Sequence, residues 1–246
     1  MGIRMGIRDF LRGVRGRGPK EAGRSPGGSR LLRYSGGEFE KPKFGFTEEP
    51  ADELAEAREK VYDEIFGKCD SVYHELLPVV PHVDVYRIPP VGKREFFTFV
   101  TGGMSDLPMN TPKNVDKDYR RIELVFYASE DKPEYHEVLR GLAHFPHDND
   151  TWIHWGHTMP NGTPPEPIFE GSVLDTFFFM PSILRPDSEL GSRLSHHGEA
   201  VHLVWCVPIT TAECNLKLER GSDALYELFE ERKHPFVFSG KRQSYL

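Results

Sequence analysis

The sequence lacks the features of a protein that spans a membrane or is exported through one. No apolar run approaches the roughly 20 residues that a membrane-spanning helix needs, and the N-terminus has no apolar signal-peptide core. Cysteine is also scarce. Cys69, Cys206 and Cys214 form no C-x-x-C pair and are odd in number, which favours a reducing compartment over a disulfide framework. We therefore expect a soluble, cytoplasmic protein without a membrane partner.

Motifs of catalysis are absent as well. The sequence contains neither the G-x-S-x-G of a serine hydrolase nor the H-E-x-x-H of a zinc peptidase. One glycine-rich stretch, residues 101–109 (T-G-G-M-S-D-L-P-M), has no lysine where a phosphate-binding loop requires one. It predicts instead a crossing of backbone where only glycine fits, with Ser105 or Asp106 capping a turn. We expect no catalytic residues, no cofactor and no enzyme activity.

Charge divides the chain into two parts. The 246 residues carry a net charge of −7. Residues 1–43 hold eleven Lys and Arg against four acids, a balance of +7, so residues 44–246 carry −14. Because residues 1–43 are rich in Gly, Arg and Ser and poor in apolar groups, they are expected to form a disordered basic extension. Residues 44–246 form the expected domain, whose acidic surface disfavours nucleic acid and suits a basic protein partner.

The clearest folding unit lies near the C-terminus. Residues 201–207 (V-H-L-V-W-C-V) alternate with period 2 and are apolar on both faces, as in a strand buried within a sheet. Pro208, which has no N–H to donate, is expected to end that strand. Thr210 and Glu213 have the spacing of a capping box and so predict the start of a helix, which Gly221 would end.

The remaining elements alternate irregularly between helices and strands. This order, with its hairpin-like neighbours, favours an α+β fold: a single domain with a mixed, mostly antiparallel β-sheet flanked by α-helices. The other predicted elements are a helix from Thr47 to Gly67, a helix that opens at Pro133, strands at 83–86, 96–100, 120–128, 152–155 and 173–180, a second C-terminal helix capped by Ser222, and an edge strand at 236–238.

Four of the eleven histidines lie close together in the sequence. His144, His147, His154 and His157 form two H-x-x-H pairs near acidic residues, a combination of ligands that zinc sites use. Pro146 is expected to keep the first pair off a regular helix, and the second pair would point to opposite faces of an extended strand. We therefore expect no metal site, and a zinc-dependent hydrolase built on these histidines is the less favoured alternative.

Aromatic residues gather in the same stretch. Phe145, Trp152, Trp155 and His157 lie just before a proline-rich loop at residues 160–167. Aromatic side chains near the end of a sheet are typical anchors of protein interfaces. Ordinary core packing also accounts for such residues, because half of the residues of a strand face inward.

Six motifs follow one another along the chain. They are T-G-G-M-S-D-L-P-M (101–109), R-R-I-E-L-V-F-Y (120–127), L-R-G-L-A (139–143), W-G-H (155–157), V-H-L-V-W-C-V-P-I-T-T-A-E (201–213) and G-S-D-A-L-Y-E-L (221–228). In this order they resemble the Suppressor of fused domain family, from about residue 46 to about residue 242. The resemblance implies a non-enzymatic domain with a mixed sheet flanked by helices.

The resemblance also implies a partner. In animals, the family's Hedgehog-pathway member is a scaffold that grips an extended peptide of Gli transcription factors between this domain and a second one. A single-domain chain resembles the bacterial branch, whose domains are similar to immunity proteins that neutralise toxins. By position, Phe145 corresponds to an aromatic residue of the family's peptide-binding region. Gly156 and His157 fall near its acidic contact, where this chain has no acid.

We therefore predict a bacterial immunity-type protein that binds and neutralises a toxin domain of basic charge. Its expected partner-binding residues are Phe145, Trp152, Trp155, Gly156 and His157. Within the same class of function, the alternative is a signalling adaptor or scaffold that binds a peptide of a regulatory protein.

Overall fold

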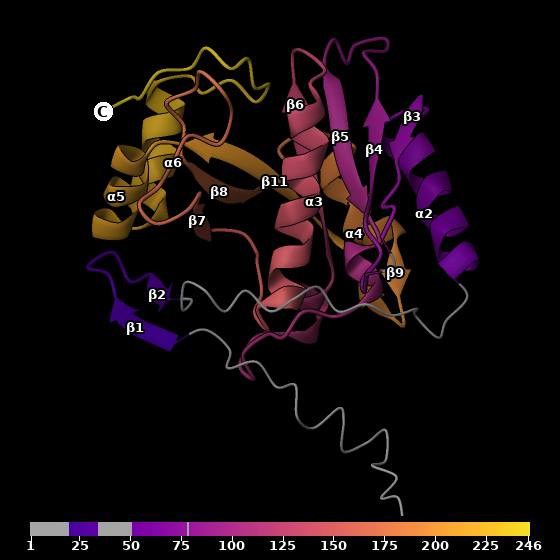
Figure 1. Cartoon of the computed structure of the whole chain (residues 1–246), viewed down its shortest axis with the longest axis horizontal. Helices are drawn as coiled ribbons and strands as arrows, with labels where there is room; N and C mark the ends of the chain where they lie inside the picture. Colours follow the sequence, from indigo (N-terminus) through magenta and orange to yellow (C-terminus); the bar gives the residue numbers. More distant parts are fainter. Residues whose placement is uncertain (1–19, 34–50, 78) are drawn as a thin grey trace, which may run out of the picture.

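The computed structural model describes residues 20–33, 51–77 and 79–246. Its centre is a seven-stranded β-sheet in the order β3-β4-β5-β6-β11-β8-β7 (Figure 1). All neighbouring strands are antiparallel except β6 and β11, which run parallel. The prediction of a single α+β domain with a mixed, mostly antiparallel sheet is confirmed. The strands are β3 (Ser71–Tyr73), β4 (Asp84–Ile88), β5 (Phe97–Gly102), β6 (Ile122–Ala128), β7 (Thr158–Pro160), β8 (Thr176–Pro181) and β11 (His202–Ile209).

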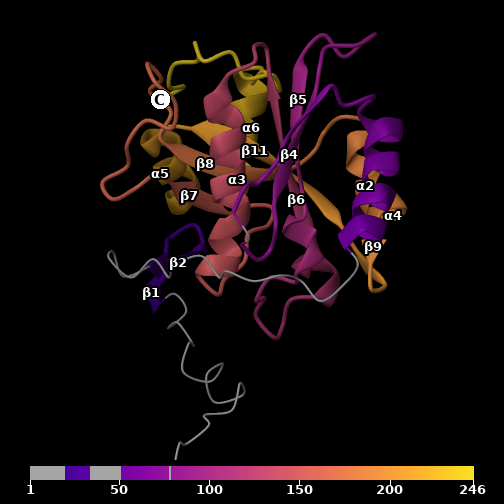
Figure 2. The same ribbon diagram turned by 45° about the vertical axis from the view of Figure 1, so that its right-hand side comes forward.

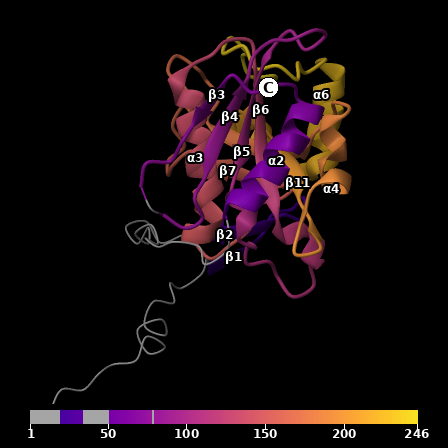
Figure 3. The same cartoon turned by 90° about the vertical axis from the view of Figure 1, so that its right-hand side faces the viewer.

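Helices cover both faces of the sheet, as the view along its edge shows (Figure 3). On one face α3 (Pro133–Asp148) packs through Tyr135, Leu139 and Leu142. The other face is covered by α2 (Ala51–Ile65), α4 (Leu190–Arg193), α5 (Thr211–Arg220) and α6 (Ser222–Glu231). Three 3₁₀ turns and two small ribbons complete the described elements: η1 (Met104–Asp106), η2 (Lys117–Arg120), η3 (Asp187–Glu189), β1 (Lys20–Arg24) with β2 (Arg30–Arg33), and β9 (Ser195–His196) with β10 (Glu199–Ala200). Within the described residues, none of the helices has the length and apolarity that crossing a bilayer requires.

The central strand is apolar on both faces, as its sequence predicts. In β11, Leu203, Trp205 and Val207 join the apolar cluster beneath α2, α5 and α6. Val204 and Cys206 join the cluster beneath α3. The strand therefore connects the two halves of the core.

The expectation that Pro208 ends this strand is wrong, because β11 continues to Ile209 with Pro208 opposite Phe177 of β8. The pairing of β11 with β6 extends only from His202 to Trp205. Beyond Trp205, on the side of β11 that no longer pairs with β6, the carbonyl of Pro208 accepts a hydrogen bond from Arg242 Nη2 (2.9 Å). In a strand, the amide nitrogen and the carbonyl of one residue point to the same side. The position of the missing N–H of Pro208 therefore also faces away from β8, and no hydrogen bond between strands is lost.

Two local expectations before β7 are also wrong. The helix α3 runs through the buried Pro146 to Asp148, since a proline so near the end of a helix removes only one bond of its last turn. Residues 152–155 form no strand, because the chain turns at Gly156 (φ +81°). Hydrogen bonding to β8 begins only there, with the Gly156 amide donating to the Phe179 carbonyl (2.7 Å).

The basic N-terminal segment contains structure that its composition does not predict. Residues 20–33 form the β1–β2 hairpin, which lies below β7 and α5 (Figure 2). The expectation of disorder is therefore wrong for residues 20–33. The remainder of residues 1–43 and the predicted helix cap Thr47 lie outside the described residues.

Near the C-terminus, residues 236–238 return to the sheet as predicted, but only as a single parallel bridge. Phe238 pairs with Ala128 at the end of β6. The Phe238 amide donates to the Tyr127 carbonyl (2.8 Å), and its own carbonyl accepts from the Ser129 amide (2.9 Å).

A buried carboxylate then fixes the C-terminal tail to α5. The predicted capping box is present: Glu213 accepts from the Thr210 amide (2.9 Å), and Thr210 Oγ1 accepts from the Glu213 amide (3.3 Å). The same carboxylate, which is fully buried, accepts from Arg242 Nη1 (2.6 Å) and Nη2 (2.7 Å) and from the Tyr245 amide (3.0 Å). These bonds lower the pKa of Glu213 against the opposing effect of its burial.

We expect Arg242→Ala to lower the free energy of unfolding by about 3–5 kcal/mol, because Glu213 would become a buried carboxylate without its counter-ion. Urea unfolding followed by circular dichroism measures this loss. Lys241→Ala, which removes the exposed neighbouring charge, should change the value by less than about 0.5 kcal/mol. Equal effects of the two substitutions would contradict this role for Arg242.

Candidate functional site

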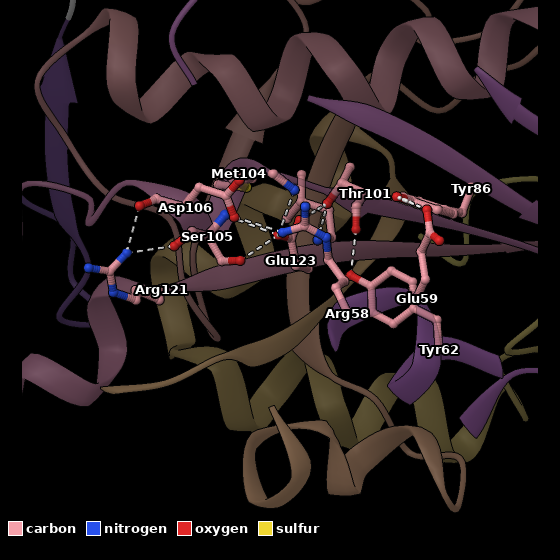
Figure 4. A network of polar contacts seen from close by, with 12 residues as sticks. Arg58, Glu59, Tyr62, Tyr86, Thr101, Met104, Ser105, Asp106, Arg121 and Glu123 are labelled. Carbon is pink, nitrogen blue, oxygen red and sulfur yellow. Dashed lines mark hydrogen bonds and ion pairs between the residues drawn. The ribbon is translucent and has the colours of Figure 1, made fainter. Parts of the chain in front are cut away.

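A fully buried glutamate holds the glycine-rich segment 101–109 against β6 (Figure 4). All four hydrogen-bond contacts to the Glu123 carboxylate come from donors in that segment. Such complete satisfaction is what burial of a carboxylate requires. The donors are Thr101 Oγ1 (2.7 Å), the amides of Gly103 and Ser105 (3.0 Å each) and Ser105 Oγ (2.6 Å).

Two arginines complete this network. Nη1 of Arg58, from α2, lies 2.7 Å from Asp106 Oδ1 and 3.7 Å from Glu123 Oε1. Burial raises the pKa of Glu123, and the charge of Arg58 acts in the opposite direction. Arg121 donates to the carbonyls of Ser105 (2.7 Å) and Asp106 (2.9 Å). The segment is therefore held from α2 and from β6 at once.

The predicted backbone crossing is confirmed at Gly103. Its φ of +111° is in the left-handed region, and a Cβ atom there would lie 2.0 Å from the His82 carbonyl oxygen. Because Glu123 is 0% exposed, its carboxylate positions the chain and does not reach the surface.

The exposed part of the same end of the sheet is aromatic. Four rings from three segments touch one another: Tyr119 of η2, His154 and Trp155 before β7, and His202 at the start of β11. Tyr119 and Trp155 remain 36% and 37% exposed, whereas His154 is buried. The six ring-centroid distances are 4.7 Å (Tyr119–His154), 6.2 Å (Tyr119–Trp155), 5.3 Å (Tyr119–His202), 4.5 Å (His154–Trp155), 5.6 Å (His154–His202) and 5.4 Å (Trp155–His202).

Burial keeps the two histidines of this group neutral. It lowers the pKa of His154 to about 3, with a smaller contribution from His202, and it lowers the pKa of His202 as well. The buried Nε2 atoms of both rings have no hydrogen-bond partner among the described residues. The indole of Trp155 is fixed by donating from Nε1 to the Leu203 carbonyl (3.3 Å).

A second aromatic pair adjoins the first group. The rings of Trp152 and His157 lie 4.5 Å apart, and Trp152 is 6.4 Å from His154. Burial lowers the pKa of His157 to about 4, with further lowering by Lys217 and Arg30. We call these six residues the aromatic surface: Tyr119, Trp152, His154, Trp155, His157 and His202.

The structure brings most of the predicted binding residues together. Trp152, Trp155 and His157 belong to the aromatic surface, and Gly156 makes the turn between the last two. Phe145 lies on α3 and, like Trp152, packs at the margin of the apolar cluster beneath that helix.

The four histidines of the zinc alternative do not converge. His144 Nε2 pairs with Glu75 Oε1 (2.8 Å), His147 Nε2 lies 3.2 Å from the Met104 carbonyl, and His154 and His157 lie in different parts of the aromatic surface. Among residues 20–33, 51–77 and 79–246, no group of three His, Cys, Asp or Glu side chains is placed to hold a metal ion.

Sequence reasoning missed His202 and Tyr119 as members of the aromatic surface, and it considered His154 only as a zinc ligand. His202 stands out as the one polar residue of its strand, V-H-L-V-W-C-V, and this irregularity is a usable signal. Tyr119 lies in the polar stretch D-K-D-Y-R, which offers no periodic pattern that would mark it.

Glu123→Gln tests the buried network. The amide NH₂ of glutamine would face groups that are themselves donors, so we expect a loss of about 3 kcal/mol or more in the free energy of unfolding. Urea unfolding measures this loss, and hydrogen exchange of the Gly103 and Ser105 amides should accelerate. Glu137→Gln on the exposed face of α3 is the matched control, and an equal effect there would refute the assignment.

The neutral His154 predicts a pH dependence. Between its usual pKa of 6.5 and its folded value of about 3, only the unfolded chain takes up a proton at this residue. Stability should therefore fall as the pH falls below 6.5, by up to about 1.4 kcal/mol per pH unit. Urea unfolding at pH 7, 6 and 5 should show a shallower decline for His154→Phe than for the wild type. A His154 NMR resonance that titrates near pH 6.5 would contradict the prediction.

Comparison with solved structures identifies the fold. A protein described as a Suppressor of fused homologue from Neisseria gonorrhoeae FA 1090 aligns with a TM-score of 0.55 and 19% identity, over 78% of this chain and 94% of that one. A chain of the Sufu–Fu complex aligns with a TM-score of 0.53 and 14% identity, over 83% of this chain and 93% of that one. Drosophila Suppressor of Fused aligns at 0.48 with 13% identity, over 77% of this chain and 50% of that one.

A search among curated proteins finds no match. The model of the Suppressor of fused protein family matches residues 80–243, a span that begins just before β4 and includes Glu123, segment 101–109 and the aromatic surface. The chain therefore belongs to the Suppressor of fused family.

Proposed function

We propose that this domain is a non-enzymatic, protein-binding member of its family that acts as an immunity-type protein in a bacterial cytoplasm. It binds a toxin domain and neutralises it. The partner docks on the aromatic surface, with Gly156 and Phe145 beside it.

The observation that carries this proposal is that the side chain of Trp155 is exposed and yet held in a fixed orientation. A tryptophan that is 37% exposed, yet fixed by a hydrogen bond to β11 and by the rings of Tyr119 and His202, has little conformational entropy to lose on binding. Rigid, exposed tryptophan and tyrosine side chains are the residues most often found at the centre of protein interfaces.

The buried acids of the domain support a non-enzymatic role. Carboxylates that act as general acids or bases are usually left within reach of a substrate. Here each of three fully buried acids is instead paired with the charge of an arginine from a distant segment. The pairs are Glu123 with Arg58, Asp187 with Arg94 and Glu213 with Arg242.

Charge and cysteine chemistry support the proposed partner and compartment. The net charge of residues 44–246 would accelerate encounter with a basic toxin, and less so at high salt. The thiols of Cys69, Cys206 and Cys214 are all free, which suits the reducing conditions of a cytoplasm.

A signalling adaptor is the second candidate, and one comparison favours it. A chain with the same fold has been solved in the Sufu–Fu complex. An adaptor would use the same surface and differ only in the identity of the protein that it binds.

Co-expression tests the immunity role. Expression of the toxin domain encoded beside this gene should arrest growth, and co-expression of the intact chain should restore growth and allow the two to be purified together. Failure to rescue, combined with binding to a non-toxic regulatory protein, would favour the adaptor. Failure of the chain to bind any encoded neighbour would refute the immunity proposal.

The substitution Trp155→Ala tests whether the partner binds at the aromatic surface. We expect it to weaken partner binding by about 2 kcal/mol, or roughly 30-fold in Kd, measured by calorimetry with the co-purified partner. Val91→Ala is the control, because Val91 is an exposed apolar residue in the β4–β5 turn, at the other end of the sheet. Equal binding by both variants would place the interface elsewhere.

A further inference from the structure

The β1–β2 hairpin is an exposed basic ribbon on an acidic domain. Residues 20–33 have a charge balance of +3, whereas residues 44–246 carry −14. The charged side chains of the ribbon are all exposed: the cations Lys20, Arg24, Arg30 and Arg33, and the acid Glu21. Glu21 pairs with Arg30 at 2.9 Å, so the excess charge belongs to the other three cations.

Strand pairing places these cations against one another. Lys20 lies opposite Arg33, and Arg24 lies opposite Arg30. Like charges directly opposite in an antiparallel pair repel each other and weaken the pairing. Arg24 makes a hydrogen bond of 3.4 Å to the Gly28 carbonyl. Among the described residues, no acid pairs with Lys20, Arg24 or Arg33, and the hairpin therefore presents these three cations to solvent.

The turn of the hairpin is fixed to the junction of α5 and α6 by backbone contact, below β7 (Figure 2). The Gly27 amide donates to the Leu218 carbonyl (2.8 Å) near the end of α5. A Cβ atom at Gly27 would lie 2.3 Å from the Gly221 amide nitrogen, so only glycine allows the two backbones to come this close. The exposed ribbon is thus attached to the domain at a defined place.

The same junction touches the aromatic surface. Ser222 directly follows Gly221, and a Cβ atom at Gly156 would lie 3.6 Å from Ser222 Oγ. A chain of direct contacts therefore joins the hairpin turn to the residue that follows Trp155. A standard interface covers about 800 Å² of each partner, a patch that extends about 16 Å from its centre. A protein bound with Trp155 at the centre of its contact therefore reaches the hairpin.

We propose that the β1–β2 hairpin is a second docking element, which binds an acidic patch of the protein partner. This inference rests on the proposed function, because it extends the surface that is centred on Trp155. Carboxylates of the partner complement the charges of Lys20, Arg24 and Arg33 and relieve the repulsion across the ribbon. Nucleic acid, another polyanion that a basic ribbon could bind, is disfavoured by the charge of −14 on residues 44–246.

Two variants with the same change in net charge separate this local contact from the long-range field. Arg24→Gln/Arg33→Gln removes two cations from the hairpin, and Lys60→Gln/Lys93→Gln removes two exposed cations from α2 and the β4–β5 turn. Calorimetry with the co-purified partner should show about fivefold weaker binding for the hairpin variant, and a smaller difference at high salt. The control variant should bind a basic partner at least as tightly as the wild type. Equal effects of the two variants, or no weakening in the hairpin variant, would overturn the inference.

Gly27→Ala tests the position of the hairpin without changing its charge. The added Cβ atom would collide with the backbone of the α5–α6 junction, so the hairpin should leave its place. Hydrogen exchange of the amide at position 27 should accelerate, and partner binding should weaken by about the same factor as in Arg24→Gln/Arg33→Gln. Gly141→Ala on α3, where a Cβ atom meets nothing within 4 Å, should change neither. Unchanged exchange or unchanged affinity in Gly27→Ala would overturn the inference.

Hexaglutamate is a probe of defined chemistry that tests the hairpin without the partner. Titrated into the intact chain at low salt, it should shift the backbone NMR resonances of residues 20–33 in the wild type and not in Arg24→Gln/Arg33→Gln. The absence of a shift in the wild type would overturn the inference. A DNA duplex that binds the same residues more tightly than hexaglutamate would overturn the assignment to an acidic protein patch.

The two proposals can fail separately. A hexaglutamate response without any protein partner would leave the hairpin as an acid-binding element and refute the proposed function. A partner whose affinity falls with Trp155→Ala but not with Arg24→Gln/Arg33→Gln would retain the proposed function and refute the role of the hairpin.

Discussion

The buried carboxylate of Glu123 is the interaction on which the rest of this domain depends. It gathers the donors of segment 101–109 around one point of β6 and places Arg58 of α2 beside them. The neighbouring residue Ile122 pairs with His202, where the parallel strand β11 begins. The position of the aromatic surface, which is built on His202, therefore follows from the position of Glu123.

A buried acid paired with an arginine from a distant segment occurs at two other places in the domain. Asp187 accepts from both Arg94 and the hydroxyl of Tyr127, which ties the turn after β4 to the segment before α4. Glu213 ties the C-terminal tail to α5. Each pair is costly to bury and costly to break, so the domain is held as a rigid frame. Such a frame suits the proposed function, in which tryptophan and tyrosine side chains are presented in fixed positions.

The sequence predicted those features that depend on periodicity and local chemistry. The alternation of β11, the capping box of α5 and the glycine at the crossing of segment 101–109 each have a signal within a few residues. The acid–arginine pairs had no such local signal, because the two residues of a pair lie as far apart in the sequence as Arg94 and Asp187. For the same reason Tyr119 was not foreseen as part of the site. The error at Pro208 arose because strand pairing, which is a tertiary contact, decided whether its missing N–H was needed. The error at Pro146 arose because its place in the last turn of α3 limits the loss to one hydrogen bond.

Under the proposed function, the net charge of the domain and its aromatic surface act on the partner at different distances. The charge of −14 on residues 44–246 sets the long-range field, which acts over about one Debye length and governs the rate of encounter. Under the proposed function, the contact itself is decided at short range, where Trp155 and Tyr119 are exposed and the indole of Trp155 is fixed by its hydrogen bond to the Leu203 carbonyl. The field of the domain would then set how fast the partner arrives, and the aromatic surface would set how tightly it is held.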